Sequence, residues 1–138
     1  MEAPVVNHWI DHLGVATESI ERTARTFRGL FDAELVHEET MPDGLEIAFL
    51  ALENATIELL QPTDSGTVRR FLDRSGAGIH HFGVGTPDIE ASLTAAVTAG
   101  ITPIDETPRP GAMGHEVAFL HPRDTGGVLV EFVQHSAS

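Results

Sequence analysis

The 138-residue sequence contains no cysteine. Disulfides, thiolate nucleophiles and cysteine-based zinc or iron-sulfur sites are therefore excluded, and any metal must be held by histidine nitrogen and by oxygen. The chain also lacks an apolar run long enough to cross a membrane. Its start, MEAPVVNHW, has neither the basic nor the apolar segment of a signal peptide. We therefore expect a soluble, cytoplasmic protein with no membrane partner.

Lysine is absent as well, so all eight basic side chains are arginines, against 21 acidic ones and a net charge of −13. Such a surface offers no basic face that could neutralise phosphates, and nucleic acid is excluded as the expected partner. Acidity alone is typical of ordinary soluble proteins. Acidity without lysine favours a halophile-like protein, since high salt screens the self-repulsion.

What the sequence does contain is an internal repeat. IDHLGVATESIE (residues 10–21) aligns without a gap with IHHFGVGTPDIE (residues 79–90). Two further pairs follow in the same order: EIAFL (46–50) with EVAFL (116–120), and TIELLQ (56–61) with LVEFVQ (129–134). A conserved order of matches within one chain indicates a duplicated module.

Each copy is predicted to form a strand, an amphipathic helix and three more strands. Apolar residues recur at helical spacing over residues 18–31 and 88–99, with Asp88 as the predicted N-cap and Gly100 as the predicted stop. The predicted fold is α+β, with two tandem βαβββ modules that form a curved, partly open eight-stranded mixed sheet around a metal-containing cavity.

We expect one domain over residues 1–138. The first module covers about residues 8–62, a linker helix lies within about residues 63–77, and the second module covers about residues 78–136. A module of this size buries too little surface to be stable alone, so the two modules should close around one cavity. The exposed edges of such a sheet make a homodimer the expected assembly.

The repeat aligns His12 with His81, and it aligns Asp11 with His80. Successive side chains on a strand point to opposite faces. Only one histidine of the His80–His81 pair can therefore face the cavity. The alignment selects His81, and we expect His80 to face away.

Glu58 and Glu131 are also aligned, and each lies between apolar residues of a predicted strand. A buried carboxylate is costly unless it is paired or bound to a metal. Together with His12 and His81 these residues predict a four-ligand site for a divalent ion. The alternative is that each histidine bonds a backbone carbonyl in the core and each glutamate pairs with an arginine.

The paired strands IDHLGVA and GIHHFGV, and above all the stretch IDETPRPGAMGHEVAFLHPRDTGGVLVEFVQH, resemble the methylmalonyl-CoA epimerase family. That family lies within the vicinal oxygen chelate superfamily, which also holds glyoxalase I and the extradiol dioxygenases. The resemblance covers residues 10–135. It implies a divalent cofactor held by His12, Glu58, His81 and Glu131, with Co²⁺ as the expected ion and Mn²⁺, Ni²⁺ or Zn²⁺ as alternatives.

The resemblance further implies an isomerase that interconverts the two C2 epimers of methylmalonyl-CoA, a small-molecule CoA thioester. The reaction would be a 1,1-proton transfer through a metal-stabilised enolate, with an acid and a base on opposite faces of the carbon. Glu46 matches a glutamate of some family members, and Glu46 and Glu131 are the predicted catalytic pair. Glu116, which aligns with Glu46, is the alternative second acid, and Glu46 could instead be a solvated strand end.

Two other functions remain open at this stage. A glyoxalase I-type lyase acting on a glutathione hemithioacetal would use the same four ligands, and a non-catalytic small-molecule-binding protein could share the scaffold. The loop at residues 108–114 is predicted to be either a flap over the acyl group or a plain connection, and His121 is a candidate to line the pocket. The cations available for CoA are Arg69, Arg70, Arg74, Arg109 and Arg123.

Overall fold

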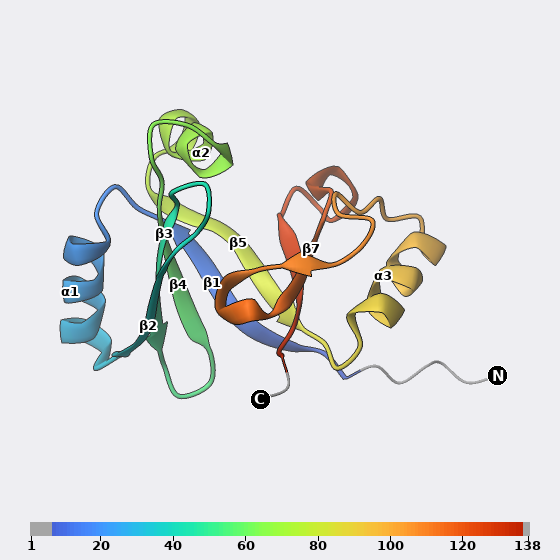
Figure 1. Ribbon diagram of the computed structural model, residues 1–138, viewed down its shortest axis with the longest axis horizontal. Coiled ribbons are helices and arrows are strands. Elements are labelled where there is room, and N and C mark those ends of the chain that lie inside the picture. Colours follow the sequence, from blue (N-terminus) through green and yellow to red (C-terminus); the bar gives the residue numbers. More distant parts are fainter. Residues whose placement is uncertain (1–6, 137–138) are drawn as a thin grey trace. The chain divides into compact units, whose positions relative to one another are not determined.

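A computed structural model of the protein describes residues 7–136. Its elements follow one another as β1 (Trp9–Ala16), α1 (Ile20–Phe31), β2 (Glu34–Thr40), β3 (Glu46–Ala51), β4 (Thr56–Gln61), α2 (Thr67–Ser75), β5 (Gly78–Gly85), α3 (Ile89–Thr98), β6 (Arg109–Pro110), the 3-10 turn η1 (Ala112–Gly114), β7 (Glu116–Leu120), the 3-10 turn η2 (Pro122–Asp124) and β8 (Val130–Gln134) (Figure 1). The order β-α-β-β-β occurs twice, as the repeat predicts.

The eight strands within residues 7–136 form one mixed sheet in the order β2-β3-β4-β1-β5-β8-β7-β6. β1 pairs with β4, and β5 pairs with β8, in parallel. The pairs β2 with β3, β3 with β4, β6 with β7 and β7 with β8 are antiparallel. The predicted α+β class with an eight-stranded mixed sheet is confirmed.

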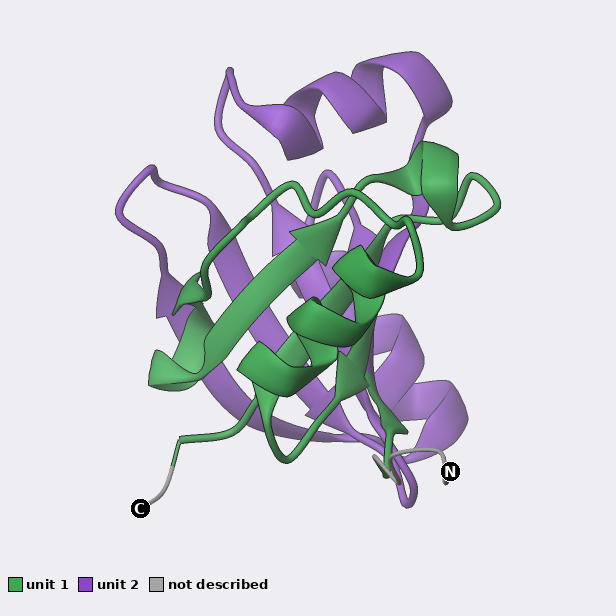
Figure 2. Cartoon of the chain, turned by 90° about the vertical axis from the view of Figure 1, so that its right-hand side faces the viewer, with its two compact units in different colours: residues 1–11, 82–138 green, residues 12–81 purple. Residues whose placement is uncertain are grey.

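The described chain separates into two compact units (Figure 2). Residues 12–81 form what we call the central unit, and residues 7–11 with 82–136 form the terminal unit. The boundaries fall inside β1 and β5. The single domain expected over residues 1–138 stays a prediction, and part of the N-terminal stretch inspected for a signal peptide lies outside the described residues.

No helix between residues 7 and 136 is both long enough and apolar enough to cross a membrane. The cytoplasmic location, the halophile-like character and the homodimer stay predictions.

In the central unit α1 packs against one face of the sheet, which we call the helix face. Ala24 of α1 is buried against Ala48 and Leu50 of β3 and against Leu59 of β4. Because side chains alternate along a strand, the residues between these apolar positions lie on the opposite face. Glu58 of β4 is one of them.

The terminal unit repeats this packing. Leu93 of α3 is buried with Ala118 and Leu120 of β7, so these two side chains of β7 face the helix. The buried carboxylate Glu131 of β8 stands beside Phe119 across the antiparallel pair. It therefore lies on the face opposite α3.

Helices α1 and α3 each begin at a point set by the last strand of their own module. The side-chain oxygen of Gln61 accepts a hydrogen bond of 2.8 Å from the backbone N–H of Ile20, and Gln134 accepts one of 2.8 Å from Ile89. Asp88 is the N-cap of α3, as predicted, and its carboxylate accepts from the backbone of the first turn. The repeat in sequence is thus also a repeat in hydrogen bonding.

The segment at residues 108–114 contains β6 and η1, and β6 pairs with the start of β7. It therefore connects strands in the terminal unit. The alternative function as a flap stays a prediction.

Candidate metal centre

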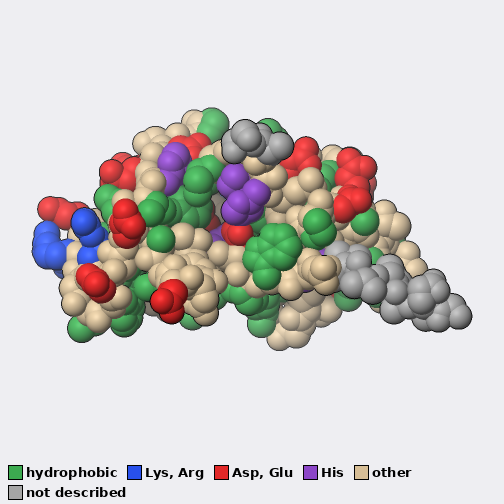
Figure 3. All heavy atoms as spheres, turned by 90° about the horizontal axis from the view of Figure 1, so that it is seen from below, with side chains coloured by type: hydrophobic (Ala, Val, Ile, Leu, Met, Phe, Trp, Pro, Cys, Tyr) green, Lys and Arg blue, Asp and Glu red, His purple; other side chains and the backbone are tan. Residues whose placement is uncertain are grey.

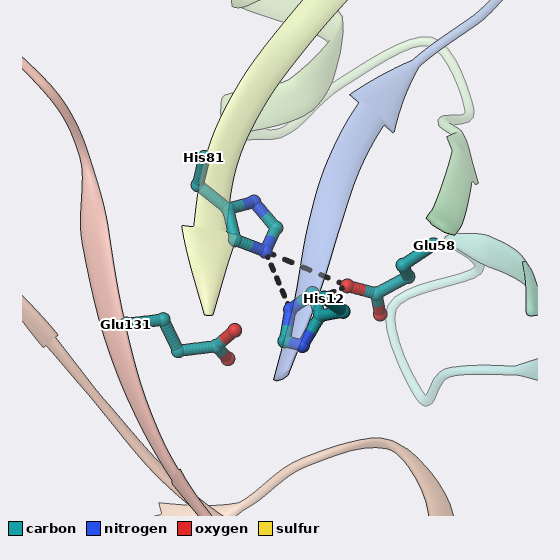
Figure 4. A group of neighbouring side chains, drawn as sticks. All are labelled: His12, Glu58, His81 and Glu131. Atoms are coloured by element: carbon teal, nitrogen blue, oxygen red, sulfur yellow. Dashed lines mark hydrogen bonds and ion pairs between the residues drawn. The ribbon is translucent and has the colours of Figure 1, made fainter. Parts of the chain in front are cut away.

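Three buried side chains of the central unit converge on the face opposite α1. Nε2 of His12 lies 3.1 Å from Nε2 of His81, and Oε1 of Glu58 lies 3.3 Å from the first and 3.5 Å from the second (Figure 4). The exposed fractions are only 4%, 4% and 7%. Three polar groups that are removed from water and point at one another need a common partner or strong mutual bonds.

The donor atoms of this cluster fit a divalent transition-metal ion. Each of the three residues offers one ligand atom, and these atoms lie within 4.8 Å of one another. An ion about 2.1 Å from its ligands holds neighbouring ligand atoms about 3 Å apart. The observed separations of 3.1 to 3.5 Å are close to that value. Imidazole nitrogen with carboxylate oxygen is a donor set that such ions accept.

Gly14 makes room for one of these ligands. A Cβ atom at this position would lie 2.2 Å from Cε1, 2.4 Å from Nδ1 and 2.7 Å from Nε2 of His81. Gly14 is also the register partner of Glu58 across the parallel β1–β4 pair. The missing side chain therefore lets the His81 imidazole lie against the backbone of β1 beside the carboxylate.

The cluster holds Glu58 in its charged form. Burial by itself would raise the pKa of this carboxyl, but hydrogen bonds and charge interactions with His12 and His81 outweigh burial and lower the pKa from 4.5 to about 2. A carboxylate that stays ionised at neutral pH is available as a metal ligand.

This lowered pKa makes the stability of the metal-free protein depend on pH. A group whose pKa is depressed by folding stabilises the fold above its unfolded pKa, and that contribution disappears as the pH falls through the folded value. The stabilisation by Glu58 should be complete above about pH 4.5 and lost between about pH 4.5 and 2. We expect Glu58→Gln to lack this component, so thermal melts of chelator-treated wild type and variant should converge as the pH falls through that window. A difference in melting temperature that stays constant with pH would contradict the assignment.

Glu131 occupies the matching place in the terminal unit (Figure 4 labels it on β8). It pairs in register with Gly83 and Phe119, as Glu58 pairs with Gly14 and Phe49. It is equally buried, with an exposed fraction of 7%. Its functions as fourth ligand and as proton carrier stay predictions.

The structure places Glu46 on the helix face. It alternates with Ala48 and Leu50, which pack against α1, and it lines a groove there together with Glu21 and Arg25. In the terminal unit Glu116 alternates in the same way with Ala118 and Leu120, which pack against α3, so it also lies on the helix face. The acid–base functions of Glu46 and Glu116 stay predictions, but a position on the face opposite to Glu58 or Glu131 argues against both.

Glu39, a carboxylate that was not predicted from the sequence, lies on the same face of the sheet as Glu58. On β2, His37 pairs in register with Phe49, and Glu39 pairs with Ile47. The Phe49 ring contacts His37 and His12, at centroid distances of 6.1 and 6.2 Å. His37 Nε2 lies 3.0 Å from Oε1 of Glu39. The alternation in VHEET indicates that His37 and Glu39 share one face of the strand. A register shift between Leu35 and His37 prevents the sequence from showing which face of the sheet that is.

Two other histidines make contacts that the sequence does not predict. Nδ1 of His80 lies 2.9 Å from Nδ1 of His81. His121 accepts a hydrogen bond from the backbone N–H of Arg123 at 3.3 Å and caps η2. The expectations that His80 faces away from the cavity and that His121 lines the pocket stay predictions.

Three of the five arginines considered for CoA have acidic neighbours in the structure. Arg69 pairs with Glu18 and Asp73, Arg109 pairs with Asp105, and Arg123 pairs with Asp124. On the face drawn in Figure 3 the acidic side chains are scattered, whereas the basic ones gather in one place. Part of the positive charge considered for an anionic ligand is therefore neutralised within the protein.

Comparison with known proteins finds one matching family model, that of the Glyoxalase/Bleomycin resistance protein/Dioxygenase superfamily, over residues 11–119. The ethylmalonyl-CoA/methylmalonyl-CoA epimerase of Cereibacter sphaeroides is 36% identical, over 91% of this chain and 96% of that protein. A crystal structure of a hypothetical protein from Bacillus halodurans matches with a TM-score of 0.91 and 36% identity, over 95% and 96% of the two chains. A variant of the Streptomyces coelicolor methylmalonyl-CoA epimerase in complex with 2-nitronate-propionyl-CoA matches with a TM-score of 0.89 and 31% identity, over 94% and 95%.

Proposed function

Because the chain belongs to the Glyoxalase/Bleomycin resistance protein/Dioxygenase superfamily and is homologous over most of its length to methylmalonyl-CoA epimerases, we propose that it is a metal-dependent methylmalonyl-CoA epimerase. The observation that carries the proposal is the buried cluster of His12, Glu58 and His81. A similar methylmalonyl-CoA epimerase has a solved structure in complex with methylmalonyl-CoA, which supports a CoA thioester as the substrate class.

In this proposal His12, Glu58, His81 and Glu131 hold the divalent ion, with Co²⁺ expected. The support for Glu131 is the repeat itself, since its register partners and burial match those of Glu58. A bound divalent ion supplies positive charge that stabilises negative charge developing on the substrate oxygens.

The proton transfer falls to side chains of the protein. C2 of methylmalonyl-CoA lies between a thioester carbonyl and a carboxylate, so its deprotonation gives a delocalised enolate. Inversion then requires a base on one face of C2 and an acid on the other. We assign one of these functions to Glu131. For the other, Glu39 is a better candidate than Glu46, because Glu39 lies on the same face of the sheet as His12 and Glu58.

The proposal predicts solvent exchange at a single carbon. Co²⁺-loaded protein incubated with one epimer of methylmalonyl-CoA in deuterated water should incorporate deuterium at C2 and produce the other epimer. Nuclear magnetic resonance follows the first signal, and chiral analysis of the acyl group follows the second. Turnover of the hemithioacetal of methylglyoxal and glutathione, without exchange at C2, would replace the epimerase by the lyase.

Metal analysis separates the enzyme from a binding protein. Wild-type protein that carries no stoichiometric ion after loading, and that catalyses neither reaction, would overturn the proposal in favour of the non-catalytic binding protein.

A further inference from the structure

We propose that His80 is a positioning residue that holds the imidazole of His81 in the orientation and tautomer required of a metal ligand. The inference rests on the proposed metal site, and it adds a residue outside the four proposed ligands. It is carried by contacts inside the central unit.

The two neighbouring rings meet at their Nδ1 atoms. Nδ1 of His80 lies 2.9 Å from Nδ1 of His81, and the rings are nearly perpendicular, at 87° with centroids 5.2 Å apart. The opposite nitrogen of His81, Nε2, points to His12 and Glu58. The His81 ring is therefore held from one end and offers its other end to the cluster.

Hydrogen-bond chemistry gives this contact a direction. A histidine that binds a metal through Nε2 needs a lone pair on that atom, so its proton resides on Nδ1. That N–H then donates to Nδ1 of His80, whose own proton lies on Nε2. Outer partners of this kind fix the tautomer and the ring orientation of metal-bound histidines.

His80 is itself held by the linker helix. Its ring packs edge to face on Phe71 of α2, with centroids 5.0 Å apart at 81°. On the same helix Val68 and Leu72 are buried, and Arg69 is bound to Glu18 ahead of α1. The place of the His81 ring therefore depends on α2, through the contact of Phe71 with His80 and of His80 with His81.

Two substitutions separate the hydrogen bond from the packing. His80→Asn keeps an acceptor oxygen close to the position of Nδ1 but removes the ring. His80→Leu has nearly the shape of asparagine without the acceptor, and His80→Phe keeps a ring on Phe71 without the acceptor. The measurements are the Co²⁺ affinity, by titration of metal-free protein against a competing chelator, and the tautomer of His81, from ¹⁵N chemical shifts of the metal-free protein.

We expect His80→Leu and His80→Phe to weaken Co²⁺ binding by about ten- to a hundred-fold, as loss of an outer-shell partner typically does. In both, His81 should change from mainly the Nδ1–H tautomer to a mixture. His80→Asn should stay near wild type in both measurements. Thermal melts identify any variant that fails to fold. If either His80→Leu or His80→Phe does not fold, the Co²⁺ affinity and the His81 tautomer of the other one test the proposal.

Three results would overturn the proposal: wild-type affinity and tautomer in both apolar variants, an equal loss of affinity in all three variants, or a wild-type His81 that carries no proton on Nδ1. If the wild type binds no Co²⁺ at all, the proposed metal site fails, whereas the tautomer measurement still decides whether His80 orients His81.

Discussion

Glu39→Gln is expected to lower deuterium exchange at C2 of methylmalonyl-CoA by about 10²- to 10⁴-fold, the usual contribution of a general acid or base. The affinity for Co²⁺ should remain that of the wild type, because Glu39 is not among the proposed ligands. Glu46→Gln is expected to leave both quantities close to wild type. The two variants remove one carboxylate each from adjacent strands, on opposite faces of the sheet.

The physical reason is the position and surroundings of Glu39. Its side chain is 30% exposed, so it is neither buried away from a ligand nor fully solvated. His37 lies 3.0 Å away and can orient the carboxylate. The glutamine variant keeps the size of the side chain and a contact to His37, but it cannot take up or release the proton. A loss of exchange in this variant therefore reports proton transfer rather than packing.

The opposite result would support Glu46, and not Glu39, as the second acid–base residue. Loss of exchange in Glu46→Gln, with normal exchange in Glu39→Gln, would show that the groove beside α1 is the reaction site. Loss of Co²⁺ binding in Glu39→Gln would instead make that residue part of the metal site.

The sequence allowed the residues of the cluster to be predicted because the module is duplicated. Aligning His12 with His81 and Glu58 with Glu131 depends only on order and spacing, and strand alternation then selects His81 over its neighbour. Three of these four residues do converge in the central unit. The βαβββ order and the Asp88 cap follow from equally local signals.

The remaining features depend on information that alternation does not contain. The register shift in β2 decides which face Glu39 shares, and a one-residue slip moves a side chain to the other face. Glu46 was predicted from its match to a glutamate of some family members, but only the packing of Ala48 and Leu50 on α1 reveals its face. The contact between His80 and His81 could not be predicted from alternation. Neighbouring side chains on a strand start toward opposite faces, but these two rings still reach each other through their Nδ1 atoms.

Gly14→Ala is expected to weaken Co²⁺ binding by about a hundred-fold or more, although Gly14 has no ligand atom. The added methyl would lie 2.2 Å from Cε1 of His81, well inside van der Waals contact. The backbone of β1 cannot yield easily, because Gly14 is held in register beside Glu58. The imidazole must therefore move, and displacement of one ligand by an ångström removes most of its bond to the metal.

A matched control for this substitution lies on α1. A Cβ atom at Gly29 would meet nothing within 4 Å, and Gly29 is inside the helix. Gly29→Ala should leave Co²⁺ binding unchanged and stabilise the protein by about 0.5–1 kcal/mol, because alanine loses less backbone entropy in a helix. Wild-type Co²⁺ affinity in Gly14→Ala would show that the His81 ring does not need the space above this glycine. A large loss with unchanged thermal stability of the metal-free protein would show that the glycine serves the position of the ligand rather than the fold.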